Sequence, residues 1–516
     1  MNANKITVVL SVVLAIPFVG VADISVSVWK GETYSFRKTV RNPGAAWDEA
    51  QVSVVAPAWA GVPEGFSVKA GVLDLVKTSV APGSPDYLLR PDVVKWNGSR
   101  RLRGKEGCVV VGQVTASAEV AAGVYDLTFN GERVKVRVVD RTLPPVAERR
   151  YFLDLWQHPW AVARYFGVRP FSAEHYARMR PLWRQLAAAG QRTITATILD
   201  RPWNHQCQDA YGTMVRRVKR ADGSWSFDYT LFDEYVAFCR DCGLGPDICC
   251  YTMVPWGDRV SWEDEKGAMH YVEVKAGTAE YEAYWGPFLS DFTRHLEAKG
   301  WLANAYISMD ERPAEVMAKA VEIIRTYGKG LSISTAGNSK PSDFKGIVIE
   351  NYCQYVEYIT PEFLAEAETR RAQGMRTTYY VCCGPVYPNT FVMSDPDESF
   401  WVGVYPAFVG LDGFLRWAYD SWPLDPYDDS TYGAWRGGDT YFVYPNGEPS
   451  YRFLELQNGI QQAEKVNVLR AADALPADFA ALAESAGFKK MNASLKAGDM
   501  KPLVDVKTRT LEILNR

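Results

Sequence analysis

Ala305-Tyr306-Ile307-Ser308-Met309-Asp310-Glu311-Arg312-Pro313 is an alternating stretch that ends in two acids, an arginine and a proline. Side chains alternate between the two faces of a β-strand, so the pattern predicts a strand with Ile307 and Met309 on one face and Asp310 on the other. The proline favours an extended residue before it and a helix start after it. In Ala314–Tyr327, apolar residues recur at helical spacing and form one stripe. The predicted unit is therefore one β-strand followed by one amphipathic helix.

The same unit recurs along the chain from Arg150 onward. The strand candidates are Tyr151–His158, Thr193–Leu199, Asp247–Val254, Ala305–Glu311, Leu331–Thr335, Gly346–Tyr352, Arg376–Cys382 and Gly413–Tyr419. The helix candidates between them include Ala173–Ala189, Leu231–Cys242, Tyr281–Lys299, Ala314–Tyr327 and Pro361–Gln373. Such alternation is typical of an α/β fold with a parallel sheet and crossover helices. It fits a (β/α)8 TIM-type barrel best, and an open doubly wound sheet is the alternative.

Three further segments are expected around the barrel, which is assigned to residues 146–470. Residues 1–22 place Lys5 before an apolar run and end in small residues, as a secretory signal peptide does. Short alternating runs separated by Gly, Pro, Asn and Asp predict a β-sandwich domain over residues 23–145. The last barrel helix is expected at Ser450–Arg470, and residues 471–516 are expected to be a C-terminal appendage.

Composition and charge argue against nucleic acid and membranes as binding partners. The formal net charge of the 516 residues is only −4, so we expect no attraction to nucleic acid or to an anionic membrane. The signal peptide predicts export to the periplasm or the medium, and no cysteine follows it directly to carry a lipid anchor. No later apolar stretch is long enough for a stable membrane span. The sequence does not determine the oligomeric state.

Metal and cofactor chemistry finds little support in the sequence. The nine cysteines include Cys239-Arg-Asp-Cys242, which could bind a metal, but no histidine lies at zinc-ligand spacing from it. Cys249-Cys250 and Cys382-Cys383 fall in β-like runs, where cysteine behaves as a small apolar residue. There is no dinucleotide fingerprint, phosphate loop, nucleophile elbow or zinc helix. We therefore expect no metal and no cofactor.

The paired acids Asp310 and Glu311 are the strongest candidates for chemistry. Active sites of (β/α)8 barrels lie at the carboxyl ends of the strands, which is where these two residues are predicted. Two close carboxylates with aromatic neighbours should raise the proton affinity of at least one of them, as a general acid requires. The alternative is a pair of acids that simply favours the dipole of the following helix.

Several motifs together resemble glycoside hydrolase family 123. They are Asp154-Leu155-Trp156-Gln157-His158-Pro159, Asp310-Glu311-Arg312-Pro313, Leu415-Arg416-Trp417-Ala418-Tyr419-Asp420-Ser421-Trp422, Gly438-Asp439-Thr440-Tyr441-Phe442-Val443-Tyr444-Pro445, Arg452-Phe453 and Asn458-Gly459-Ile460-Gln461. The resemblance implies a retaining β-N-acetylgalactosaminidase that acts by substrate assistance. It further implies that Asp310 polarises the 2-acetamido group of the sugar and that Glu311 is the general acid and base. The partner would be a glycan with a terminal N-acetylhexosamine.

Other residues at or just past the strand ends are expected to surround the sugar. The substrate-binding candidates are Trp156, His158, Tyr251, Asn351, Tyr379, Trp417, Trp422 and Asp439, with Trp203 and Trp256 in the same positions. We expect Trp417 and Trp422 to stack on the sugar, and His158 and Asp439 to bind hydroxyl groups. Core packing, or a turn at Asp439, is the alternative for each. The long loops Asp200–Thr230 and Gly257–Gly277 could wall off the pocket.

Two other functions remain open on the sequence. The sugar could be N-acetylglucosamine or another acetamido sugar, because one hydrogen bond at the fourth carbon decides that preference. The barrel could also bind carbohydrate without cleaving it, although the presence of both carboxylates argues against this.

Overall fold

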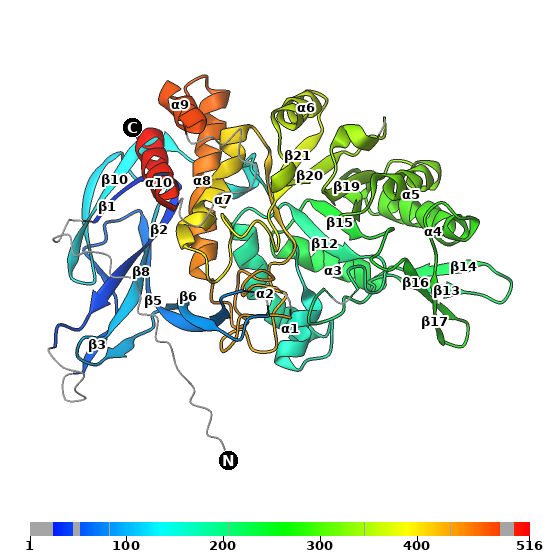
Figure 1. Cartoon of the computed structure of the whole chain (residues 1–516), viewed down its shortest axis with the longest axis horizontal. Helices are drawn as coiled ribbons and strands as arrows, with labels where there is room; N and C mark the ends of the chain where they lie inside the picture. Colours follow the sequence, from blue (N-terminus) through cyan, green and yellow to red (C-terminus); the bar gives the residue numbers. More distant parts are fainter. Residues whose placement is uncertain are drawn as a thin grey trace, which may run out of the picture.

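The computed structural model describes residues 24–44, 52–81, 83–204, 206–344, 346–433, 435–485 and 500–516. It has a sheet-rich N-terminal part beside a larger α/β part (Figure 1). The signal peptide predicted at residues 1–22 lies outside the described residues.

Eight parallel strands form the sheet of the α/β part. They are β11 Phe152–Leu155, β12 Thr193–Thr197, β15 Asp247–Tyr251, β18 Ala305–Met309, β19 Ser332–Gly337, β20 Asn351–Tyr355, β21 Arg376–Tyr380 and β22 Gly413–Arg416. Their order in space, β11-β22-β21-β20-β19-β18-β15-β12, follows the chain around a ring. The prediction of a TIM-type barrel is therefore confirmed, and the doubly wound alternative is wrong.

A side chain completes the barrel between β11 and β12. The backbones of Leu153 and Gln191 form an isolated parallel bridge there. The Gln191 side-chain amide donates to the carbonyl of Leu155 at 3.0 Å and accepts from its N–H at 2.8 Å. Buried peptide groups need partners, so Gln191 supplies the hydrogen bonds that a longer strand would have made.

Helices surround the sheet (Figure 1). They are α1 Pro159–Phe166, α2 Ala173–Ala188, α3 Thr230–Asp241, α4 Ala279–Ala298, α5 Ala314–Tyr327, α6 Pro361–Ala372, α7 Pro396–Val409 and α8 Tyr451–Ala471. The predicted stripe of α5 is buried through Met317, Ala320, Val321 and Ile324. Helices α7 and α8 meet at Gly403 and Gly459, where an added Cβ would lie 2.6 Å and 2.1 Å from backbone oxygens of the facing helix.

The N-terminal part is a β-sandwich, as predicted. One sheet has the order β1 Ile24–Lys30, β10 Glu132–Thr142, β9 Gly123–Phe129 and β4 Trp59–Ala60. The other has the order β2 Thr33–Arg41, β8 Gly107–Ala116, β5 Phe66–Ser79 and β6 Tyr87–Trp96, and β3 Ser53–Val55 pairs with β7 Arg100–Leu102. Valines such as Val28, Val110 and Val136 fill the space between the two sheets.

Buried ion pairs fix the sandwich to helix α8 of the barrel. Arg452 Nε lies 2.9 Å from Asp92 Oδ1, and Lys465 Nζ lies 2.7 Å from Glu32 Oε2. The C-terminal segment joins the same interface through α9 Ala477–Ser485 and α10 Met500–Leu514. The Trp29 indole donates to the carbonyl of Leu514 at 2.9 Å. The end of the chain is thus packed between sandwich and barrel, whereas the sequence suggested an appendage.

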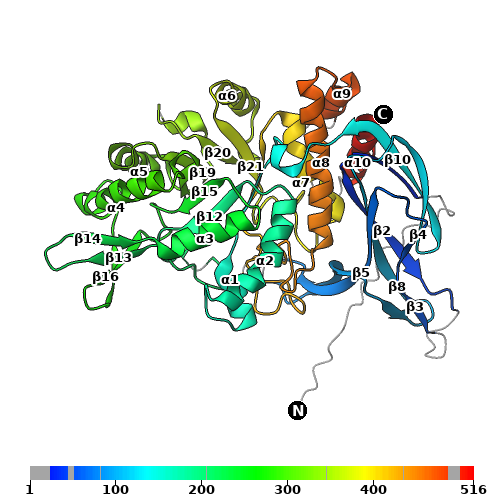
Figure 2. The same cartoon turned by 180° about the vertical axis from the view of Figure 1, so that it is seen from behind.

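The two long loops form a small sheet of their own. Residues of the first loop build β13 Arg216–Lys219 and β14 Trp225–Asp228, and residues of the second build β16 Arg259–Asp264 and β17 Met269–Glu273. The strand order is β14-β13-β16-β17, and the sheet projects at the end of the molecule far from the sandwich (Figures 1 and 2). No described helix is long and apolar enough to cross a membrane.

Candidate active site

Asp310 and Glu311 directly follow β18 and are both partly buried. The Trp256 indole N–H donates to Asp310 Oδ2 at 2.8 Å from the loop after β15. The Tyr380 hydroxyl, at the end of β21, donates a short hydrogen bond to Glu311 Oε1. Since β21 is three strands away from β18 in the ring, the two acids are held by separate donors from different sides of the barrel mouth.

The surroundings of Asp310 raise its affinity for a proton. Burial, followed by the neighbouring Glu311 carboxylate, raises the pKa of Asp310 to about 6. The nearby guanidinium of Arg312 is directed to Asp258 instead, with an N–O distance of 3.1 Å. This raised pKa belongs to Asp310, the acid expected to polarise the 2-acetamido group.

Aromatic side chains line the barrel interior next to the acids. The ring centroids of Trp156 and Trp203 are 5.1 Å apart, and Tyr251 lies 4.5 Å from Trp156. These rings pack with Tyr380, and Trp256 and Trp417 lie at the border of the same cluster. Water is largely excluded from such a surface, which strengthens electrostatic interactions nearby.

Asp439 forms a second polar centre near Trp417. Its Oδ1 accepts from Arg416 Nη2 at 2.6 Å and from the Trp417 indole at 3.2 Å. Its Oδ2 is buried and has no hydrogen-bond partner among the described residues. Asn389 also binds Arg416, at 2.7 Å, so the guanidinium is fixed from two sides. The free oxygen of Asp439 is an acceptor that a ligand hydroxyl could satisfy.

The model of the glycoside hydrolase 123 catalytic domain matches residues 156–469, which is more than half of the chain. The chain belongs to glycoside hydrolase family 123. It is therefore a glycosidase, and its substrate is a glycan. The resemblance noted in the sequence is confirmed.

One solved structure agrees with this assignment in fold. A family 123 glycoside hydrolase from Clostridium perfringens, whose structure details glycolipid glycan hydrolysis, matches with a TM-score of 0.84 at 22% identity. The match covers 96% of this chain and 94% of that one. An endo-β1,6-glucanase matches with a TM-score of only 0.37 at 9% identity, covering 61% of this chain and 76% of that one. No curated protein matches the chain.

The structure corrects two of the aromatic candidates, Tyr379 and Trp422. Tyr379 faces outward from the barrel, and its hydroxyl donates to the carbonyl of Val402 in α7 at 2.6 Å. Trp422 is fully buried, and its indole donates to the carbonyl of Val443 at 2.6 Å. Both rings belong to the main core rather than to the barrel interior.

Two polar candidates also lie outside the site. Asn351 is the first residue of β20, where it pairs with Arg376 at the start of β21, so it lies at the amino end of its strand and not at the carboxyl end where the prediction placed it. The apolar run before Asn351 had suggested a strand that starts at Gly346. His158 is fully buried under Tyr211, with ring centroids 3.7 Å apart, and burial lowers its pKa to about 3. It is thus a neutral packing residue.

Tyr380 contacts Glu311, but the sequence did not single it out as a candidate. The predicted strand Arg376–Cys382 contained it, but two adjacent tyrosines look equivalent in a sequence. Strand alternation distinguishes them, because the residues that face inward in β21 are Thr378 and Tyr380. Burial raises the pKa of Tyr380, so its hydroxyl keeps its proton and remains a donor to Glu311.

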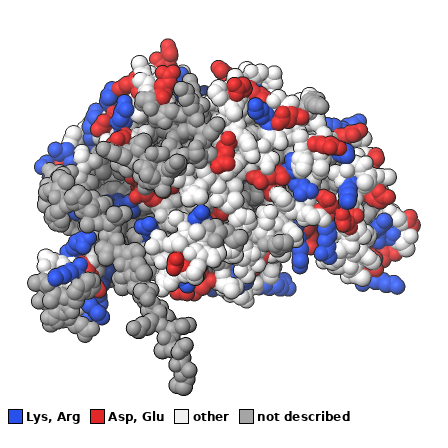
Figure 3. Space-filling view, in the orientation of Figure 1, with Lys and Arg blue, Asp and Glu red and all other residues white. Residues whose placement is uncertain are grey.

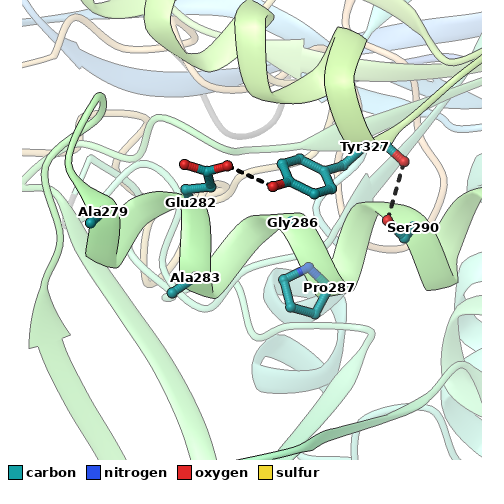
Figure 4. Close-up of a pocket in the computed structure, with 7 residues that line it drawn as sticks. All are labelled: Ala279, Glu282, Ala283, Gly286, Pro287, Ser290 and Tyr327. Atoms are coloured by element: carbon teal, nitrogen blue, oxygen red, sulfur yellow. Dashed lines mark hydrogen bonds between the residues drawn. The ribbon is translucent and has the colours of Figure 1, made fainter.

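Elsewhere on the surface formed by the described residues, no comparable group of side chains is present. A groove between α4 and α5 is lined by Ala279, Glu282, Ala283, Gly286, Pro287, Ser290 and Tyr327 (Figure 4). Its single carboxylate, Glu282, already accepts from the Tyr327 hydroxyl at 2.6 Å. Acidic and basic side chains are mixed on the face shown in Figure 3. The described residues contain no group of three or more His, Cys, Asp or Glu that could hold a metal.

The raised pKa of Asp310 predicts a pH-dependent stability. The folded protein binds a proton at Asp310 more tightly than the unfolded chain, so its free energy of unfolding should fall as the pH rises from about 4 through about 6. Asp310→Asn removes this titration. The Tm of the variant relative to wild type should therefore increase over that interval and level off above it.

Differential scanning fluorimetry across this pH range measures the effect. Asp505→Asn, at an exposed position on α10, is the control and should follow wild type at every pH. A constant difference between Asp310→Asn and wild type would contradict the assigned pKa.

Proposed function

We propose that this family 123 enzyme removes terminal β-linked N-acetylgalactosamine from glycans by substrate assistance, with retention of configuration. The observation that carries the proposal is the pair of consecutive acids at the end of β18, each held by its own donor. The proposal also includes export, which the predicted signal peptide supports.

In the first step, the acetamido oxygen of the substrate attacks the anomeric carbon, and the bond to the leaving oxygen breaks. Glu311 gives its proton to that oxygen, and an oxazolinium ion results. In the second step, water attacks the anomeric carbon as Glu311 takes its proton. Two inversions at one carbon give net retention, and the protein needs no nucleophile of its own.

The hydrogen bonds of the two acids fit these roles. Trp256 occupies Oδ2 of Asp310, which leaves Oδ1 for the N–H of the acetamido group. As that nitrogen becomes cationic, an Asp310 carboxylate that is poorly solvated stabilises the charge strongly. Tyr380 occupies Oε1 of Glu311, which leaves Oε2 to carry the transferable proton. In each acid, one carboxyl oxygen is held by a hydrogen bond and the other is available to the substrate.

A covalent mechanism fits the site less well. A conventional retaining pair places its two carboxyl groups about 5 Å apart on either side of the sugar. Asp310 and Glu311 come from one strand end, and Asp439 is engaged with Arg416 and Trp417. The acetamido oxygen is therefore the nucleophile that best suits this arrangement.

Asp439 and Trp417 support a sugar as the substrate. The free oxygen of Asp439 offers an acceptor for a sugar hydroxyl, and Trp417 offers a ring beside it. The Clostridium perfringens relative was studied for hydrolysis of glycolipid glycans, which supports a glycan of that kind as the natural substrate.

Substitution of the general acid tests the proposal. Glu311→Gln and Asp310→Ala should each lower kcat on a nitrophenyl β-N-acetylgalactosaminide by about a hundredfold or more. Glu315→Gln, in the first turn of α5, is the matched control for an acid at that helix start and should leave kcat unchanged. Wild-type turnover by Asp310→Ala would refute substrate assistance.

The two adjacent tyrosines provide a second test. Tyr380→Phe removes the hydrogen bond that holds the Glu311 carboxyl group in place and should lower kcat by roughly tenfold to a hundredfold. Tyr379→Phe removes a bond to a core carbonyl, so it should cost about 1 kcal/mol of unfolding free energy without a change in kcat. Steady-state kinetics and urea unfolding of both variants separate the effects. Equal loss of kcat in the two variants would contradict the assigned role of Tyr380.

A further inference from the structure

Cys382 and Cys383 form a pair of thiols that the proposed reaction does not use. They follow Tyr380 at the end of β21, and their sulfur atoms are 3.9 Å apart. Cys383 is exposed and Cys382 partly exposed, whereas the other seven cysteines of the chain are buried. All nine cysteines are free thiols, so reagents in solvent meet this pair first.

A second pair of consecutive cysteines shows that adjacency alone does not bring thiols together. Cys249 and Cys250 lie within β15, and alternation places Cys249 inside the barrel and Cys250 in the outer core. At Cys382 the chain has already left its strand, so both sulfur atoms can lie on one side. The sequence had suggested a buried strand position for all four.

The segment that carries the thiols is tied to the candidate active site. The carbonyl of Val381, the residue after Tyr380, accepts from Arg416 Nη1 at 3.2 Å. The carbonyl of Cys382 accepts from Asn389 Nδ2 at 3.1 Å. Gly384 is so close to Tyr355 that an added Cβ would lie 2.6 Å from its hydroxyl oxygen. A movement of this segment therefore reaches Tyr380 on one side and the Arg416–Asp439 pair on the other.

We propose that Cys382 and Cys383 are a modification site at which a small-molecule disulfide converts the two thiols into a vicinal disulfide and lowers turnover. The Cys383 thiolate attacks one sulfur of the small disulfide and expels the first thiol, which leaves a mixed disulfide on Cys383. The Cys382 sulfur then loses its proton, attacks Cys383 and expels the second thiol. The protein loses two hydrogen atoms, that is two protons and two electrons, and the small disulfide gains them as two thiols.

The arrangement of the two thiols favours formation of the disulfide and also its later reduction. The hydrogen bond from the Cys382 thiol lowers the pKa of Cys383, which increases the reactive thiolate. Closing the bond brings the sulfur atoms from 3.9 Å to about 2 Å, so the segment must move. Consecutive Cα atoms lie about 3.8 Å apart, less than in ordinary disulfides, so the product is strained and easily reduced.

Oxidised glutathione and the native full-length enzyme provide the test. After incubation and alkylation, the mass of the peptide with Cys382 and Cys383 should show the loss of two hydrogen atoms and no alkylation. Turnover of the nitrophenyl β-N-acetylgalactosaminide should fall by about tenfold or more, because small displacements of catalytic groups are costly. Dithiothreitol should restore it.

Variants test whether the loss of turnover depends on Cys382 and Cys383 or on other thiols. Cys382→Ser should accumulate the mixed disulfide on Cys383, and Cys383→Ser should keep its turnover in the presence of the oxidant. Cys250→Ala, which alters the buried pair, should respond as wild type does. A stable mixed disulfide on wild-type Cys383, or a closed pair with unchanged turnover, would overturn the proposal. The activity measurement rests on the proposed function, whereas the mass measurement decides the modification site even if the substrate is different.

Discussion

Side-chain alternation in a parallel barrel is the constraint on which the rest of the structure depends. In each strand one set of residues faces the helices and the other faces the interior, and the parallel register brings the carboxyl ends together. Ile307 and Met309 pack outward, so Asp310 is directed into the mouth. The same rule sends Tyr379 to α7 and Tyr380 to Glu311. A shift of one residue in either strand would separate the acids from their donors.

Burial determines the electrostatic properties of the acid at the mouth of the barrel. Asp310 sits beside Trp256 and near a set of packed aromatic rings, and its raised pKa reflects the cost of keeping a charge there. In the proposed mechanism, this cost is offset when a positive charge develops on the substrate, since the attraction is strong where water is scarce. The sandwich supports the barrel through the buried pairs Arg452–Asp92 and Lys465–Glu32. The C-terminal helix α10 adds the ion pairs of Lys507 with Asp397 and Glu455. They stabilise the wall of the barrel that carries Asp439.

Much of the fold was predictable because its signals are local. The alternation of strands, the helical stripe of α5 and the acids before Pro313 can all be identified within a few residues of sequence. The long-range features could not be identified in this way. Asn351 was placed at the wrong end of its strand because an apolar run preceded that strand, and Trp422 was predicted at the barrel rim although it is fully buried. The link between Tyr380 and Glu311 depends on which strands meet across the mouth, which the sequence does not display.

A crystal structure of the enzyme with the thiazoline analogue of N-acetylgalactosamine tests the central claim most directly. The ring of this compound mimics the intermediate that forms when the acetamido group acts as nucleophile. The proposed mechanism predicts that the thiazoline nitrogen contacts Asp310 Oδ1 and that Glu311 lies beside the anomeric carbon. An inhibitor bound elsewhere, or bound with its thiazoline ring turned away from Asp310, would contradict the mechanism.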